Sequence, residues 1–157
     1  MAVEKYKYTG AKALIQLHKK HLKLFYKTWL IAKSKSITLP KTSDPEYKSL
    51  DRLLFHVLRS AGRYMIWICA KLELPDPGIT APPPVNKIEK EAEKYMNHVL
   101  AKWENQLADV KEELFNELTY LSNWGVHYCI DAMLEHAVMH PIRHQHQLAK
   151  LNKEQGR

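Results

Sequence analysis

The stretch Met133–Leu148, MLEHAVMHPIRHQHQL, places His136, His140 and His144 at intervals of four residues. At ~100° per residue, positions four apart lie on one face of a helix, one turn from each other. The apolar residues of the same helix define the face that would turn inward: Ile130, Met133, Ala137, Pro141, Leu148 and Leu151. His144 falls near the middle of that face, His140 at its edge and His136 further toward the polar side. The sequence therefore predicts a helix that brings a histidine pair, His140 and His144, to the interior.

Two histidines one helical turn apart can bind the same metal ion. A third ligand must come from another helix, because His136 points toward the wrong side. His56 is the best candidate for this third ligand, and His18 and His21 are its competitors. If they are not ligands, His18 and His21 could contact the ligands, shuttle protons or line the cavity above the metal. The competing interpretation is that the histidines are structural and satisfied by hydrogen bonds. Burying two imidazoles without partners is costly, and a shared metal ion is one way to satisfy them.

Apolar residues recur at helical spacing through most of the chain, and no segment alternates as a strand does. The pattern predicts four main helices, at roughly 10–33, 45–74, 86–121 and 129–152. Asp109 with Glu112 gives a cap signal that predicts a break near residue 108. The segment Pro75–Val85 holds five prolines and one glycine, which predicts a stiff crossover between the second and third helices. We expect an all-α four-helix bundle.

The helix ends carry further signals. Asp44 followed by Pro45 predicts the start of the second helix. Asn86 with Glu89 resembles a capping box at the start of the third helix, and Gly125 marks the turn into the last one. The second helix is apolar nearly all round, which favours burial by the core on one side and by a second subunit on the other.

Length and composition indicate a globular protein. With 157 residues, 45% of them hydrophobic, the chain 1–157 is expected to form one domain. Met1 is followed by no signal-like segment, and the longest apolar run, Tyr64–Ala70, is too short for a bilayer. We therefore expect a cytoplasmic protein with no membrane partner. Cys69 and Cys129 show no CxxC spacing and are expected to be reduced thiols.

The formal net charge of +7 raises the question whether the protein binds nucleic acid. Many of the positive charges are lysines near the N-terminus: Lys19, Lys20, Lys23, Lys27, Lys33, Lys35 and Lys41. The sequence contains no recognisable zinc finger, RNP-type strand motif or glycine-rich phosphate loop. Solvated helix faces therefore explain these lysines better than a nucleic-acid partner does.

The run Leu134–Leu148 resembles the C-terminal signature of the DinB-like metalloproteins, which include the YfiT-like proteins. That signature typically reads Leu-x-His-x-x-x-His-x-x-x-His-Arg-Gly-Gln-Leu. Trp124–Tyr128 resembles the short segment that precedes this helix in that superfamily. Ser49–Trp67 resembles the superfamily's second helix. Two departures are Gln145-His146 in place of Arg-Gly, and Pro141 inside the motif.

The resemblance implies a four-helix bundle that binds a divalent metal, usually nickel or zinc. Carried over by position, its ligands are His56, His140 and His144, whereas His136 matches a histidine that is not normally a ligand. The resemblance also implies a homodimer.

Characterised relatives include thiol-dependent transferases and isomerases, and members thought to be hydrolases. The first hypothesis is therefore a metal-dependent enzyme acting on a small molecule, with thiol transfer preferred to hydrolysis. His18 or His21 would be the candidate acid or base, and the nucleophile would come from a low-molecular-weight thiol or water. The alternative is a non-enzymatic stress-response protein with a structural or vacant metal site, whose basic surface would bind nucleic acid.

Overall fold

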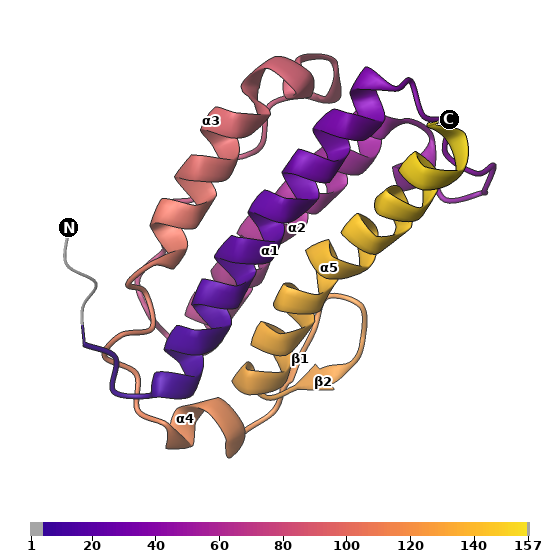
Figure 1. The fold of residues 1–157 in the computed structure, drawn as a ribbon. Coiled ribbons are helices and arrows are strands. Elements are labelled where there is room, and N and C mark those ends of the chain that lie inside the picture. Colours follow the sequence, from indigo (N-terminus) through magenta and orange to yellow (C-terminus); the bar gives the residue numbers. More distant parts are fainter. Residues whose placement is uncertain (1–4, 157) are drawn as a thin grey trace.

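The computed structural model describes residues 5–156 and is mostly helical, as predicted (Figure 1). Four long helices lie side by side: α1 (Thr9–Ser34), α2 (Leu50–Lys71), α3 (Val85–Trp103) and α5 (Ile130–Gln155). The shorter elements are the 3₁₀ turn η1 (Pro45–Tyr47), helix α4 (Glu113–Asn116) and strands β1 (Tyr120–Leu121) and β2 (His127–Tyr128). The two strands pair in antiparallel register and form a small hairpin that the sequence pattern did not indicate.

Ion pairs and hydrogen bonds at the helix ends establish how the long helices run. Lys33, at the end of α1, lies 2.6 Å from Asp51 at the start of α2 and 3.3 Å from Glu89 near the start of α3. Helices α2 and α3 therefore both run antiparallel to α1. The Tyr8 hydroxyl donates to Asp131 at 3.1 Å, so α1 and α5 begin at the same end and run parallel. The proline-rich crossover between α2 and α3 must then return along the length of the molecule (Figure 1).

Two buried tryptophans anchor the neighbouring helices to α2. Trp29 of α1 donates its indole N–H to the carbonyl of Leu50 at 2.7 Å, and Trp103 of α3 donates to the carbonyl of Ala61 at 3.0 Å. Both rings are fully buried, where an indole N–H needs a partner. These bonds hold α2, which carries one of the candidate metal ligands, between α1 and α3.

The start of the second helix differs from the prediction in detail. Asp44 does cap a helical turn, because its carboxylate accepts from the backbone N–H of Glu46 at 2.9 Å. That turn is η1, however, and α2 begins only at Leu50, where the Ser49 hydroxyl accepts from the backbone of Arg52 at 3.0 Å. The predicted helix 45–74 is therefore a separate 3₁₀ turn followed by a helix that ends at Lys71.

The third predicted helix, 86–121 with a break near residue 108, is interrupted as expected, but the break is longer and the helix after it much shorter than predicted. Helix α3 ends at Trp103, and only Glu113–Asn116 is helical in the segment that follows. Leu114, Leu118 and Leu121 are 42%, 57% and 52% exposed, so the apolar stripe that they would form on a continuous helix is not buried.

The start of α3 also differs from the prediction. Pro84 occupies the N-cap position, and no side-chain cap forms there, so the predicted capping box of Asn86 and Glu89 is absent.

The last helix extends from Ile130 to Gln155 and includes Pro141. Its entry is the β1–β2 turn, where Gly125 adopts the predicted turn with a φ of +82° that favours glycine. Ser122 closes the turn by accepting from the backbone N–H of Val126 at 3.0 Å. The hairpin lies alongside the first half of α5 (Figure 1). None of the helices within residues 5–156 has the length and apolar character needed to cross a bilayer.

Candidate metal centre

Helices α2 and α5 bring together the three histidines that the sequence predicted as ligands. One ring nitrogen each of His56, His140 and His144 lies within 4.8 Å of the others. The Nε2 atoms of His56 and His140 are 3.0 Å apart, and the ring centroids of His140 and His144 are 4.7 Å apart. His56 comes from α2 and the other two from successive turns of α5, so the cluster depends on the packing of these two helices.

Burial keeps the three imidazoles neutral. Desolvation, reinforced by the neighbouring histidines, lowers the pKa of His140 from 6.5 to about 2. Burial likewise lowers the pKa of His144 to about 4 and that of His56 below its ordinary value. A metal ion binds the neutral form of imidazole, so protons do not compete for these nitrogens near pH 7.

The 3₁₀ turn η1 contacts the outer side of two candidate ligands. Glu46 Oε2 lies 3.4 Å from His56 Nδ1, and the Tyr47 hydroxyl lies 3.2 Å from His144 Nδ1. Gln147 Oε1 is also 3.2 Å from His144 Nδ1. When His144 is protonated on Nδ1 and this N–H donates a hydrogen bond to Gln147 Oε1, the lone pair on Nε2 is free to bind a metal. Such outer contacts orient metal-binding histidines and raise their basicity.

The donor set fits a divalent transition metal. Three neutral imidazoles and no carboxylate match the three-ligand sites that leave a coordination position open. Zn–N bonds of about 2.0–2.1 Å place tetrahedral ligand nitrogens about 3.3 Å apart. The 3.0 Å separation of His56 and His140 is close to this value, and the remaining separations stay within 4.8 Å. His140 Nδ1 is buried and has no hydrogen-bond partner within residues 5–156, so within that range the hydrogen-bonding contact of this ring is the one between its Nε2 and His56.

A cavity of about 400 Å³ opens beside two of the candidate ligands. His56 and His140 form part of its wall, together with Arg59, Ser60, Arg63, Tyr64, Trp67, Asn123, Trp124, Met133 and His136. The Tyr64 ring lies edge-on to His140, with the centroids 5.8 Å apart. Burial raises the pKa of Tyr64 to about 12, so its hydroxyl remains a hydrogen-bond donor at neutral pH. The volume suits a small-molecule ligand.

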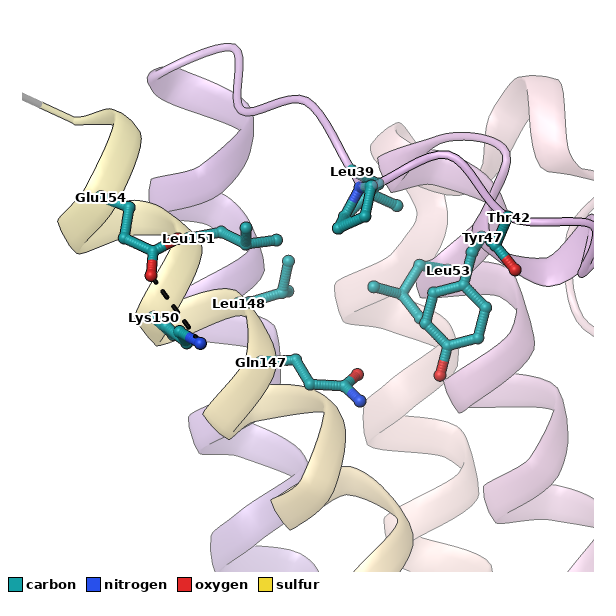
Figure 2. Close-up of a pocket in the computed structure, with 10 residues that line it drawn as sticks. Leu39, Thr42, Tyr47, Leu53, Gln147, Leu148, Lys150, Leu151 and Glu154 are labelled. Atoms are coloured by element: carbon teal, nitrogen blue, oxygen red, sulfur yellow. Dashed lines mark ion pairs between the residues drawn. The ribbon is translucent and has the colours of Figure 1, made fainter.

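Tyr47 also lines a second cavity, of about 420 Å³ (Figure 2). Leucines from α2, α5 and the loop after α1 form much of its wall: Leu39, Leu53, Leu148 and Leu151. Figure 2 shows Gln147 of α5 reaching across this cavity toward the Tyr47 ring. Tyr47 and Gln147 therefore both line this apolar cavity and contact His144 of the candidate metal centre.

The other histidines singled out in the sequence lie outside the cluster. His18 is fully buried on α1 and stacks on Trp103 at a centroid distance of 3.7 Å. His21 is half-buried on the same helix, and neither residue lines the cavity beside the ligands. Their acid–base role stays a prediction. His136 is not part of the cluster and packs on Trp124 at 5.2 Å, in keeping with its predicted outward position.

The cysteines offer no obvious nucleophile. Burial raises the pKa of the Cys69 thiol to about 11, which keeps it protonated at neutral pH. The Cys129 sulfur accepts from the backbone N–H of Ala132 at 3.5 Å and caps α5. Both thiols are free, as the sequence predicted.

Most of the residues around the histidine cluster were not predicted from the sequence. On α2, the cavity-lining positions His56, Ser60, Arg63 and Trp67 follow one another at intervals of four, three and four residues, which is the spacing of one helix face. That spacing was a usable signal. The sequence contains no comparable signal for Glu46 and Tyr47, because their contacts depend on how η1 folds back onto α2 and α5.

The chain matches no protein-family model, no curated protein and no solved structure. The function must therefore be argued from the cluster and its surroundings.

Proposed function

We propose that His56, His140 and His144 bind one divalent transition metal, nickel or zinc, and that the protein is a metal-dependent enzyme acting on a small molecule. The observation that carries this proposal is the convergence of three neutral imidazole nitrogens within 4.8 Å. The resemblance of residues 134–148 to the DinB-like signature supports the same ligands and a four-helix-bundle architecture.

Thiol transfer is the reaction class we favour, ahead of hydrolysis. When bound, such a metal would make a thiol or a water molecule nucleophilic at neutral pH by lowering its pKa. The protein's own thiols are poorly suited to this role, because Cys69 is buried and Cys129 caps a helix. The cavity beside His56 and His140 offers space for a substrate, and the Tyr64 hydroxyl offers a hydrogen-bond donor there.

Metal content tests the site directly. We would measure nickel and zinc by elemental analysis in protein purified without a histidine tag, beside a His140→Ala/His144→Ala variant. The control is His146→Ala, an exposed histidine of the same helix that is not in the cluster. Near-stoichiometric metal in the wild type and the control, with loss in the double variant, is the expected result. A wild type that stays empty after incubation with both metals contradicts the proposal.

Turnover tests the enzymatic part. We expect the metal-loaded protein to transfer a low-molecular-weight thiol to an electrophilic probe, and His140→Ala to abolish this turnover while circular dichroism shows an intact fold. If the metal binds but its removal changes only the stability of the helices, the metal is structural and the enzyme proposal is wrong.

A further inference from the structure

We propose that the cavity beside the metal centre binds a small aromatic carboxylate, with its anionic group at Arg63 and Arg59 and its ring against Trp124. This inference rests on the proposed function, because it names the class of substrate that would lie next to the metal. It is carried by the charge, the donors and the aromatic surface of the cavity wall.

The charge of the wall is positive. Arg59 and Arg63 lie one turn apart on α2, and the residues that line the cavity include no Asp or Glu. Arg63 is exposed, and within residues 5–156 no acidic side chain pairs with it. Arg59 is 3.4 Å from Glu46 and lies over the Phe55 ring at 5.3 Å, so its guanidinium is held in place. A metal held by three neutral histidines would keep its full charge and add to this field.

The neutral polar groups of the wall can all donate hydrogen bonds. The Ser60 hydroxyl, the Tyr64 hydroxyl and the Asn123 amide line the same space as the two arginines. Arginine itself only donates, and its planar guanidinium matches the two oxygens of a carboxylate. A wall that supplies donors and positive charge without a carboxylate suits a ligand rich in acceptor oxygens.

A fixed and accessible aromatic ring forms another part of the wall. Trp124 is 48% exposed although it is held on two sides: its ring stacks on His136 at 5.2 Å, and its Nε1 donates to the Tyr128 hydroxyl at 3.3 Å. Trp67 and Tyr64 provide further aromatic surface on the α2 side. Flat ligands gain from stacking on such rings. The cavity volume of about 400 Å³ limits the ligand to a small molecule.

The test compares an acid with its uncharged isostere. Zinc-loaded, full-length protein is titrated calorimetrically with 2-naphthoate and with 2-naphthamide. We expect the carboxylate to bind at least about tenfold more tightly than the amide, since an arginine–carboxylate pair contributes a charge-assisted hydrogen bond. Arg63→Met should weaken naphthoate binding about tenfold or more. Trp124→Leu should weaken the binding of both naphthoate and naphthamide.

Arg52→Met is the matched control, because Arg52 is on the same helix and does not line the cavity. It should leave naphthoate binding unchanged. Equal affinities for the acid and the amide, or an Arg63→Met variant that binds naphthoate as the wild type does, would overturn the inference. Circular dichroism confirms that each variant is folded.

Repeating the titrations on metal-free protein separates this inference from the proposed function. Binding that depends on Arg63 in a protein that takes up no metal supports the anion site and contradicts the metal site. Stoichiometric metal without naphthoate binding leaves the proposed function standing and contradicts the anion site.

Discussion

The imidazole of His18 is a polar group inside the hydrophobic core. It is fully buried, and neither ring nitrogen has a hydrogen-bond partner within residues 5–156. Stacking on Trp103 covers one flat face of the ring, but it does not replace the hydrogen bonds that the two ring nitrogens would make in water. Desolvation therefore lowers the pKa of His18 from 6.5 to about 3.

This burial predicts that His18 makes the protein sensitive to acid. Between pH 3 and 6.5 the unfolded chain binds a proton at this residue and the folded chain does not, so lowering the pH favours unfolding. His18 alone should reduce the free energy of unfolding by roughly 1 kcal/mol between pH 7.5 and 5.5. His18→Phe keeps the stack on Trp103 and should remove this part of the pH dependence. Urea denaturation of metal-free protein at the two pH values measures it, and an unchanged pH dependence in the variant contradicts the argument.

Glu46 and Tyr47 contact the histidine cluster from outside, and each can be tested singly. Glu46→Gln removes the negative charge 3.4 Å from His56 Nδ1, and Tyr47→Phe removes the hydroxyl at His144 Nδ1. Loss of such an outer contact typically weakens metal binding about 10–100-fold. We expect each variant to bind zinc at least about tenfold more weakly in a chelator competition assay.

The control for these variants is Glu91→Gln, which removes an exposed carboxylate on α3. It should leave the zinc affinity unchanged. If Glu91→Gln weakens zinc binding as much as Glu46→Gln does, the effect reflects total charge rather than orientation of His56.

At the residue scale, the three histidines of the cluster were predictable from the sequence, whereas the residues around them were only partly so. His140 and His144 follow from helical spacing alone. His56 was the best candidate for the third position on the residues themselves, with His18 and His21 as competitors, and the family resemblance favoured the same residue. Glu46 and Tyr47 were not predictable, because a short 3₁₀ turn shows no periodicity that would indicate which helix it contacts.

At the scale of elements, replacing Pro141 tests how α5 positions its two candidate ligands. A proline inside a helix costs about 3 kcal/mol in helix formation, whereas burial of its ring recovers about 0.8 kcal/mol for each methylene group. Pro141 is buried, so Pro141→Ala should raise the free energy of unfolding by only about 1 kcal/mol. Urea denaturation checks this value, and a loss of stability would show that packing of the ring dominates.

The zinc affinity of the same variant answers a second question. Pro141 lies between His140 and His144, so a change in affinity would show that the proline sets the spacing of the two imidazoles. An unchanged affinity would show that it only shapes the helix against the core.

The segment after α3 shows where periodicity misleads. Leu107, Val110, Leu114, Leu118 and Leu121 fit one helical stripe, yet only Leu107 and Val110 are buried. Phe115, which is not part of that stripe, is fully buried instead. A short connection between α3 and the hairpin gains more from placing this one aromatic ring in the core than from extending a helix into solvent.

At the scale of the whole molecule, bound metal should stabilise the fold. A ligand that binds only the folded state contributes about 2.7 kcal/mol at a free concentration one hundred times its Kd. For a chain of this size that corresponds to an increase in Tm of roughly 5–10 °C. Differential scanning fluorimetry with and without zinc measures it. The His140→Ala/His144→Ala variant should show no increase, and an equal increase in that variant would point to zinc bound elsewhere.

The path of the proline-rich crossover has a consequence for how the protein would respond to cleavage. The crossover carries exposed residues such as Asp76, Gly78 and Thr80, and it separates His56 from its partner His140, which lies 84 positions further along the chain. A protease that cut there would leave one candidate ligand on the first fragment and two on the second. A metal ion bound by all three histidines would then link the two fragments reversibly. Removing the metal with a chelator would weaken their association, in the same way that a reductant separates two peptides joined by a disulfide.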